Sequence, residues 1–476
     1  MAWPDLRSFL AALETRGDLV RIPDPVHWEY EAVGLTRLTS DIEGPALVFE
    51  RMRDSDLACV SGLFAAKRRV AWALEVDESE LDAAYREREG RSLDPVVTSG
   101  AAPCREIVLT GDAIDLNALP ILRHYERDGG RYVTAGLQVA KDPESGVRNV
   151  SIHRMLLLDR NHLTVFAPLG RHLRTIIERW HERGSGAEIA TAIGTEPATQ
   201  IASQSRVAYG VDEFAVAGGL RGEPVELTRG HSIDVEVPAT TEIVIEGRTV
   251  PGELVTDGPF GEYPGTYSDA KPAPVLEVTA ITMRTGALYQ NTLTGMPMTE
   301  NHWMMQAAAV SLAWREALKI TPEVRAVNVT NGGSTRHHVV VSIHKRHPSE
   351  ARNLMLALLA APLGAKLVTV VDADIDVFDP HHVEWAVNTR VQADRDVVIL
   401  PDLYSPTLDP SAPAPRTSAK MGIDATAPLD RRELYEPARV VGIERMDLGR
   451  YLEGAAWRRP EGTALRPGGR QSGDGA

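Results

Sequence analysis

The segment from Val255 to Tyr267, VTDGPFGEYPGTY, holds two acids, Asp257 and Glu262, among glycines and prolines. Glycine tolerates unusual backbone angles because it lacks a Cβ atom, and proline fixes φ, so the segment predicts a tight and ordered turn. Such a turn can direct both carboxylates into one space, and we place the chemistry of the chain here. A structural loop would use the same glycines and prolines, so the segment alone does not separate the two interpretations.

A second polar group lies in the segment NVSIHRM, which contains Asn149, Ser151, His153 and Arg154. If the run from Asn149 to Val165 is one nearly continuous strand, alternation places the first three on one face and Arg154 on the other. Polar groups in such an apolar run are costly to bury without partners. They are either paired polar groups of a β domain or part of a site.

Basic residues in two separate segments could bind a phosphate. His172 and Arg171 begin a helix predicted over Arg171 to Arg183, and a helix N-terminus offers free N–H groups to an anion. A capping or surface role explains a single histidine there equally well. Lys420 lies in the Ser/Thr/Gly-rich segment TSAKMGIDAT, which could also contact a phosphate.

Two groups of acids have ordinary alternative explanations. Asp212 and Glu213, in YGVDEFAV, could be an exposed acidic pair. Asp372, Asp374 and Asp376 alternate after a predicted strand and could bind a metal ion. A solvated edge or a patch paired with arginine is the interpretation that we favour for these three acids.

The composition restricts the class of protein. The chain has 476 residues, 43% of them hydrophobic and 25% charged, as in a globular protein. Its net charge of −15 argues against a nucleic-acid-binding face and gives no reason to expect binding to an anionic membrane. The two cysteines fit no metal-site spacing and indicate a reducing compartment, and no secretory segment or long apolar run is present. We therefore expect a soluble, cytoplasmic protein.

The order of the helices and strands that the sequence predicts indicates an α/β (α+β) multidomain protein. Helices alternating with short strands predict an N-terminal α/β domain over residues 1–106. Many short β-rich runs around one helix predict a barrel-like β domain over residues 107–299. A long apolar linker helix is expected over residues 300–320, a C-terminal α/β domain over residues 321–440, and a disordered tail over residues 441–476.

The sequence resembles the UbiD family of reversible (de)carboxylases, which use prenylated flavin mononucleotide (prFMN). Matching segments run in order along nearly the whole chain, which makes the resemblance specific. They are LRSFLAALETRGDLVRI, DLNALPIL, HYERDGGRYVTAG, NVSIHRM, YGVDEFAVAGGLRGEPVEL, VPATTEIVIEG, DGPFGEYPG, VDADIDVFDPHHVEWAVNTR and KMGIDAT.

The resemblance implies a cofactor site in a central split β-barrel of the flavin-reductase type. It implies a divalent metal ion, Mn²⁺ or Mg²⁺, held by Asn149, His172 and Glu213 beside the flavin phosphate, with K⁺ near the same glutamate. Oxygen and imidazole ligands suit such ions. The positions implied to contact the flavin or its metal are Thr134, Asn149, Ser151, Ile152, His153, Arg154, Arg171, His172, Ser203, Glu213 and Lys420.

The resemblance also implies an acid–Arg–acid catalytic set. Arg154 takes the arginine position and Glu262 the proton donor. Asp257 stands where the family has a glutamate, one methylene longer, and a carboxylate of either acid can pair with a guanidinium in fork geometry. Burial and the nearby Asp257 should raise the pKa of Glu262, and Tyr263 and Met305 are expected to line the substrate pocket.

The implied activity is reversible, non-oxidative decarboxylation of an α,β-unsaturated or aromatic acid. The alternatives are a flavin-dependent oxidoreductase or flavin reductase, which needs no acid–Arg–acid set, and a catalytically inactive assembly subunit. The implied partners are a flavin prenyltransferase that supplies the cofactor and a second copy of the chain in a homodimer or higher homo-oligomer. No nucleic acid and no membrane are expected as partners.

Overall fold

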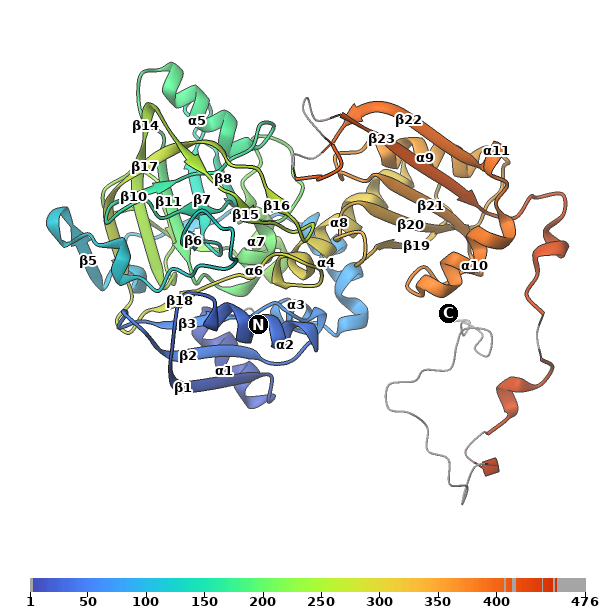
Figure 1. Cartoon of the computed structure of the whole chain (residues 1–476), viewed down its shortest axis with the longest axis horizontal. Coiled ribbons are helices and arrows are strands. Elements are labelled where there is room, and N and C mark those ends of the chain that lie inside the picture. The colour runs from blue at the N-terminus through green and yellow to red at the C-terminus, as the bar shows by residue number, and fades with distance from the viewer. Residues whose placement is uncertain (1–2, 406–407, 413–416, 439, 448–449, 452–476) are drawn as a thin grey trace. The chain divides into compact units, whose positions relative to one another are not determined.

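The computed structural model describes residues 3–405, 408–412, 417–438, 440–447 and 450–451 (Figure 1). They form two compact units, which we describe separately. The first comprises Met1–Leu312, Asn331–Arg336 and Tyr404–Ser418, and the second Ala313–Thr330, His337–Leu403 and Ala419–Ala476. The five-part division expected from the sequence stays a prediction.

The N-terminal part of the first unit is a four-stranded sheet with helices. Asp5 caps the first helix by accepting a hydrogen bond from the Ser8 amide at 2.9 Å, and four apolar side chains of that helix are buried. The sheet has the order β1-β2-β3-β18, so a strand from far along the chain completes it. The elements are α1 (Leu6–Thr15), β1 (Leu19–Val26), α2 (Glu31–Asp41), β2 (Ala46–Met52), β3 (Ala58–Ser61) and β18 (Leu288–Gln290).

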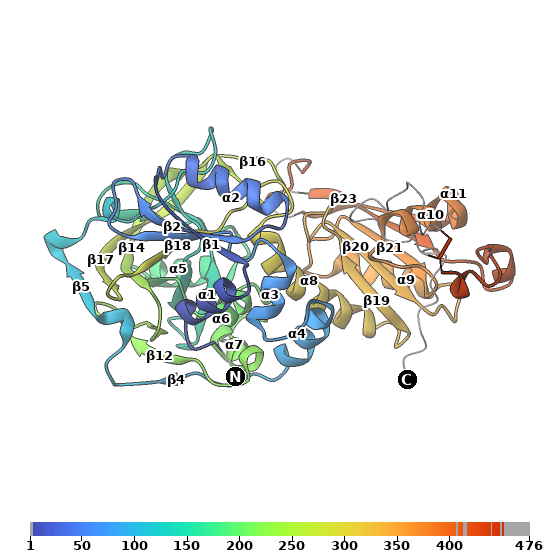
Figure 2. The same cartoon turned by 90° about the horizontal axis from the view of Figure 1, so that it is seen from below.

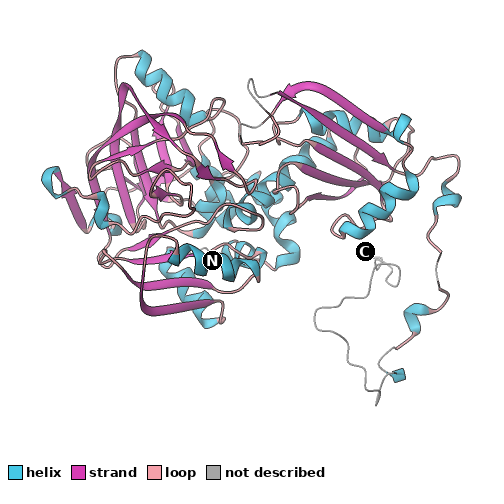
Figure 3. Cartoon of the chain, in the orientation of Figure 1, coloured by secondary structure: helices cyan, strands magenta, loops and turns pink. Residues whose placement is uncertain are grey.

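The largest sheet of this unit is antiparallel and carries the loops of the candidate site (Figure 3). Its order is β10-β17-β14-β11-β7-β8, with β5 paired to β17, and no pairing among the described strands closes it into a barrel. Helix α5 contacts β7, β8 and β14. The members are β5 (Ile107–Thr110), β7 (Leu137–Lys141), β8 (Arg148–Ile152), β10 (His162–Thr164), α5 (His172–Glu182), β11 (Glu188–Ile193), β14 (Ile243–Asp257) and β17 (Lys271–Met283).

Four helices gather beside this sheet, as Figure 2 shows. Helix α7 approaches α4 closely because Gly218 and Gly219 leave room for its backbone: a Cβ atom on Gly219 would lie 2.6 Å from the Arg88 and Arg91 carbonyl oxygens. The helices are α3 (Lys67–Ala73), α4 (Leu81–Glu89), α6 (Pro197–Ala202) and α7 (Glu213–Arg221).

Short elements complete the first unit. They are β4 (Val96–Val97), β6 (Tyr132–Val133), β9 (Met155–Leu156), β12 (Glu226–Arg229), β13 (Glu236–Pro238), β15 (Phe260–Gly261), β16 (Tyr267–Ser268) and the 3₁₀ turns Glu78–Glu80, Pro103–Arg105, Gly111–Ala113 and Leu116–Ala118.

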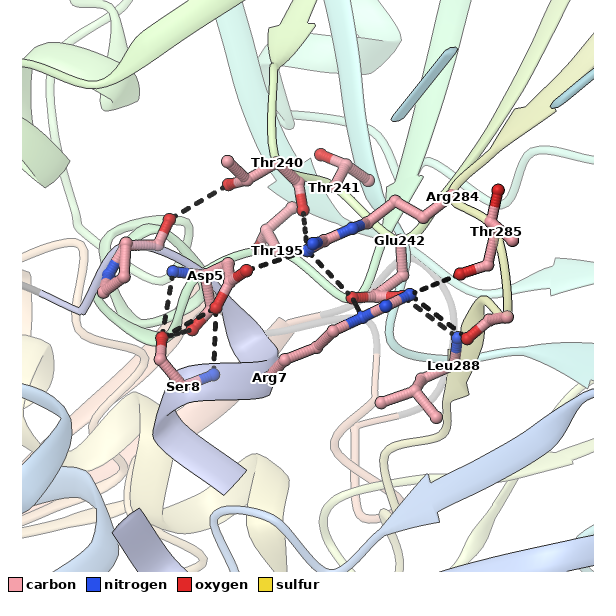
Figure 4. Close-up of polar contacts among 12 residues, drawn as sticks. Asp5, Arg7, Ser8, Thr195, Thr240, Thr241, Glu242, Arg284, Thr285 and Leu288 are labelled. Carbon is pink, nitrogen blue, oxygen red and sulfur yellow. Dashed lines mark hydrogen bonds and ion pairs between the residues drawn. The ribbon is translucent and has the colours of Figure 1, made fainter. Parts of the chain in front are cut away.

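A buried carboxylate joins the N-terminal helix to the large sheet (Figure 4). Glu242 is 0% exposed, and its two oxygens accept hydrogen bonds from Arg7 Nε and Nη2 at 2.8 and 2.7 Å. Arg284 Nη1 lies 3.3 Å from the same carboxylate and 2.9 Å from Asp5. Ion pairs therefore fix α1 against the start of β14.

The second unit has a five-stranded sheet in the order β19-β20-β21-β23-β22. The helix expected over Glu300 to Lys319 is observed as α8 (Glu300–Leu318), and its residues belong to both units. The other elements are β19 (Val324–Val329), β20 (His338–Ile343), α9 (Glu350–Ala360), β21 (Leu367–Asp372), α10 (Pro380–Arg390), α11 (Ala393–Asp396), β22 (Val397–Tyr404), β23 (Thr417–Ala425) and the 3₁₀ turns Arg432–Tyr435 and Ile443–Arg445. Most of the tail predicted to be disordered, residues 452–476, lies outside the described residues.

No helix in the described part of the chain is both long and apolar enough to cross a membrane.

Candidate active site

Arg154 lies between two acids that come from one turn. Its Nε donates to Asp257 Oδ1 at 2.8 Å, its Nη2 lies 2.6 Å from the same oxygen, and its Nη1 donates to Glu262 Oε1 at 2.5 Å. The side chains of Arg154 and Asp257 are 5% and 0% exposed, whereas that of Glu262 is 14% exposed. The three residues form one largely buried chain of charges.

The turn between β14 and β15 positions the two acids as its sequence predicts. Asp257 ends β14 and Glu262 follows β15 directly. Gly258, at φ +102°, donates its amide to the Tyr132 hydroxyl at 3.0 Å. A Cβ atom on Gly258 would lie 3.2 Å from Arg154 Nη2, so the glycine lets the guanidinium come close to the turn.

The ion pair between Arg154 and Asp257 forms, but not in the expected fork geometry. Asp257 Oδ2 accepts a hydrogen bond from the Thr164 hydroxyl at 2.5 Å. Arg154 Nε and Nη2 therefore both approach Asp257 Oδ1. The guanidinium carbon lies 4.0 Å from the centre of the Phe166 ring, which packs against the charged group. The Phe166 ring and the Thr164 hydroxyl thus fix the ion pair between Arg154 and Asp257, although aspartate is one methylene shorter than glutamate.

The expectation of one nearly continuous strand from Asn149 to Val165 is wrong. Strand β8 ends at Ile152, and short strands β9 and β10 follow after interruptions. The His153 amide donates to the Gln138 side chain at 2.6 Å instead of to a neighbouring strand. Arg154 therefore lies between strands, and simple alternation does not set its direction.

Burial raises the pKa of Glu262, as expected. Arg154 opposes this shift by favouring the charged carboxylate, and the negative charge of Asp257 adds to it. A carboxyl group with a raised pKa keeps its proton to higher pH and can act as a general acid.

Asn149 and Glu213, two of the expected metal ligands, are in contact. Asn149 Nδ2 donates to Glu213 Oε1 at 2.9 Å, and the Val150 amide donates to Oε2 at 2.7 Å. Burial raises the pKa of Glu213, the first residue of α7, to about 8. The interpretation of Asp212 and Glu213 as an exposed acidic pair is wrong, since Glu213 is 4% exposed and Asp212 binds Arg148.

His172, the third expected ligand, begins α5. Its ring lies edge-on to the Tyr209 ring at 5.2 Å, and burial lowers its pKa. In the part of the chain that the structure describes, no group of three or more His, Cys, Asp or Glu side chains is arranged to hold a metal ion. The amide oxygen of Asn149 and a buried carboxylate are donors that suit a hard divalent ion, so this pair fits such a metal.

The remaining residues expected at the flavin divide between the two units. In the first unit, Thr134 donates to the Asn291 side chain at 3.0 Å, Ser151 to Asn149 at 3.2 Å and Ser203 to the Gln200 carbonyl at 2.6 Å. Burial, with the nearby Arg171, lowers the pKa of His153 to about 3, and Ile152 pairs with Leu137 across β8 and β7. Lys420 belongs to the second unit, where its ammonium group donates to the Leu359 carbonyl at 2.7 Å. Tyr263 and Met305, expected in the substrate pocket, are both buried and both contact Arg336.

Two of the three aspartates at and after the end of β21 pair with an arginine, as in one of the interpretations that we favoured. Arg390 Nη1 lies 2.7 Å from Asp372 and its Nη2 lies 2.7 Å from Asp374. Asp376 accepts a hydrogen bond from the Phe378 amide at 2.9 Å.

Several residues that hold the site in place are missed by the sequence analysis. They are Asp128, which accepts the Gly261 amide at 3.0 Å, together with Tyr132, Thr164, Phe166 and Ser268. Each is an ordinary residue type in an ordinary local pattern. Only the folded chain brings these side chains to Arg154, so no local signal could have found them.

The three parts of the chain match models of the 3-octaprenyl-4-hydroxybenzoate carboxy-lyase proteins. The N-terminal domain model matches residues 10–88, the Rift-related domain model residues 95–297 and the C-terminal domain model residues 302–425. The chain therefore belongs to the UbiD family of carboxy-lyases.

Individual relatives support the same assignment. Anhydromevalonate phosphate decarboxylase from Methanothermobacter thermautotrophicus is 36% identical over 434 residues, which cover 90% of this chain and 99% of that protein. The UbiD-class enzyme HmfF from Pelotomaculum thermopropionicum, in complex with FMN, has a TM-score of 0.87 and 38% identity, covering 94% of this chain and all of that one. An evolved dimeric form of HmfF in complex with prFMN has a TM-score of 0.84 and 37% identity, with the same coverage.

Proposed function

We propose that this chain catalyses the reversible, non-oxidative decarboxylation of an α,β-unsaturated or aromatic carboxylic acid with prFMN as cofactor. The observation that carries the proposal is the buried chain Asp257–Arg154–Glu262. It combines a fixed cation, which can bind a carboxylate, with a carboxyl group that has a raised pKa. A flavin reductase needs no such arrangement.

The cofactor would be held by the residues of the first unit around Asn149 and Glu213, and Lys420 stays a proposed flavin contact. We propose that Asn149, His172 and Glu213 bind Mn²⁺ or Mg²⁺ next to the flavin phosphate, with K⁺ near Glu213. The FMN and prFMN complexes of HmfF support a flavin in this family. The large antiparallel sheet would serve as the split barrel of the flavin-reductase type that surrounds it.

When bound, prFMN supplies an electron sink for the bond that breaks as CO₂ leaves, and the protein positions and protonates the substrate. Arg154 binds the substrate carboxylate by a charge-assisted hydrogen bond. Asp257 and the Phe166 ring orient the guanidinium. Glu262, whose pKa is raised by burial, returns a proton to the carbon that loses CO₂.

The protein would act in the cytoplasm as a homodimer or a higher homo-oligomer, with a flavin prenyltransferase as the source of its cofactor. The dimeric form of HmfF supports the association of two copies. The Methanothermobacter relative is named for the decarboxylation of a compound that carries a phosphate, and this supports a small-molecule acid as the substrate class.

Release of CO₂ by the prFMN-loaded protein tests the proposal. The protein is produced together with a flavin prenyltransferase, purified, and incubated with a panel of cinnamate-like, aryl, dicarboxylic and other unsaturated acids. We expect CO₂ release from at least one class without net oxidation or reduction. A loaded protein that releases no CO₂ from any of them, or that oxidises a nicotinamide instead, would refute the proposal.

A further inference from the structure

Arg336 packs against the Tyr263 ring, and Arg206 and Arg171 interact electrostatically with both residues. Arg336 is 9% exposed, its guanidinium carbon lies 5.0 Å from the centre of the Tyr263 ring, and its Nη2 donates to Met305 Sδ at 3.4 Å. Its Nε is buried and has no hydrogen-bond partner among the described residues. The charged and titratable groups that face Arg206 are Arg336, Arg171, Tyr263 and Tyr85, none of them a carboxylate.

This arrangement is costly in the protein alone. Arg336 is the main cause of the lowered pKa of Arg206. Like charges repel each other, and the buried Arg336 Nε loses its hydration without compensation. An anion bound among these guanidinium groups would offset both costs.

The backbone holds Arg336 in this place under strain. Ser334 and Thr335, which precede it, have φ values of 53° and 52°, in the left-handed region that residues other than glycine rarely adopt. Both are buried, at 7% and 0% exposure. Such conformations are costly for residues other than glycine, and they cluster at ligand-binding sites.

A hydrogen bond at the neighbouring residue anchors the segment that carries Arg206. Ser205 Oγ lies 2.6 Å from the Tyr85 hydroxyl, which joins the chain after α6 to helix α4. This hydrogen bond restrains the backbone next to Arg206.

The three arginines lie next to the acid–Arg–acid set. Tyr263 directly follows Glu262, whose carboxylate binds Arg154. His302, on α8, lies 2.7 Å from the Tyr263 carbonyl oxygen and fixes that residue. Tyr263 thus follows Glu262, the proposed proton donor, in the sequence, and its ring packs against Arg336.

We propose that Arg336 and Arg206 form a second anion-binding site, which holds a phosphate or a second carboxylate on the part of the substrate away from the reacting carboxyl group. This inference rests on the proposed decarboxylation and specifies its substrate class as acids with two anionic groups. Arg154 binds the reacting carboxylate, and the Arg336–Arg206 pair binds the other anion. Arg171 remains with the flavin.

A matched substrate series with the prFMN-loaded protein tests the site. The series is (E)-pent-2-enoate and the same acid with either a carboxylate or a phosphate at its far end. We expect kcat/KM for CO₂ release to be at least about 10-fold higher with an anionic end, which corresponds to 1.4 kcal/mol. The preferred anion separates a phosphate site from a carboxylate site.

Variants assign the preference to the two arginines. Arg336→Met and Arg206→Met should each reduce the advantage of the anionic end, mainly through a higher KM, and Arg336→Lys should restore part of it. Arg325→Met serves as the matched control because Arg325 is 55% exposed and pairs with Glu323, and it should behave as the wild type.

Binding of inorganic phosphate to the loaded protein, measured by calorimetry, gives a result that does not depend on turnover. We expect binding to weaken about 10-fold or more in Arg336→Met while the flavin absorbance is unchanged. Equal binding in the two proteins, or loss of the flavin from the variant because the arginine holds the cofactor phosphate, would overturn the second site. CO₂ release without preference for an anionic end would also overturn it and leave the decarboxylation standing.

Discussion

At the scale of single residues, the site depends on one guanidinium shared by two acids in different surroundings. Asp257 is fully buried and has both Arg154 and the Thr164 hydroxyl as donors, whereas Glu262 is partly exposed and has Arg154 as its charged partner. Burial raises the pKa of Glu262, so the environments give the two carboxyl groups different roles. We propose that Asp257 orients the guanidinium and that Glu262 carries the proton.

Asp257→Asn should lower turnover about 100-fold or more, because a guanidinium displaced by as little as 1 Å no longer holds the substrate carboxylate correctly. Asp257→Glu, which keeps the charge, should retain more activity than Asp257→Asn. Steady-state kinetics of CO₂ release and the flavin spectrum of each variant provide the measurement. Full activity in Asp257→Asn would make Asp257 a purely structural acid.

At the scale of elements, the close contact between α4 and α7 supports the helix that begins with Glu213. Gly219→Ala would place a Cβ atom 2.6 Å from the backbone carbonyl oxygens of Arg88, in α4, and Arg91, just after it, and neither can move like a flexible side chain. We expect the free energy of unfolding to fall by about 1–3 kcal/mol, the usual cost of overpacking.

Gly34→Ala is the matched control for this change. Gly34 lies in α2 on an exposed position, and a Cβ atom there would meet no atom within 4 Å. Alanine has the higher helix propensity, so this variant should be about 0.5–1 kcal/mol more stable. Chemical denaturation of both variants provides the measurement, and a Gly219→Ala protein as stable as the wild type would contradict the close packing of α4 and α7.

The sequence predicts well those features that depend on neighbouring residues. Helix α8 follows from a local apolar pattern, and the turn that carries Asp257 and Glu262 follows from its glycines and prolines; the structure has both. The sequence predicts poorly the features that depend on distant partners. The strand breaks at His153, whose amide binds Gln138, and Arg154 contacts a single oxygen of Asp257 because Thr164 binds the other. Neither Gln138 nor Thr164 can be identified as a partner from the local sequence.

The same limit applies to Arg336 and Arg206. Arginines in loops usually lie at the surface, and only the folded chain brings these two to Tyr263. The resemblance to a family supplies residue roles, but it does not report which additional side chains this chain places around the pocket.

At the scale of the whole molecule, Glu242 joins the N-terminal helix to the sheet that carries the site, within the first unit (Figure 4). In Glu242→Gln an amide nitrogen would replace an oxygen that accepts hydrogen bonds and would face donors of Arg7, Arg284 or Leu288. Breaking a buried ion pair by changing one partner costs about 3–5 kcal/mol, and we expect a loss at the lower end because Arg7 is partly exposed.

Thermal or chemical unfolding measures this loss. Glu14→Gln is the control, because Glu14 and its partner Arg21 are both exposed and such a pair contributes little. The control should unfold like the wild type. A Glu242→Gln protein that also does so would show that the ion pairs do not hold α1 to the sheet.

The most direct test of the central claim is CO₂ release by the prFMN-loaded Glu262→Gln variant, with the best substrate of the wild type. Glutamine keeps the size of the side chain and can still hydrogen-bond, but it has no acidic proton to deliver. The account predicts that CO₂ release is abolished while the flavin absorbance and substrate binding remain. Near-normal CO₂ release from this variant would remove Glu262 from the mechanism and contradict the account.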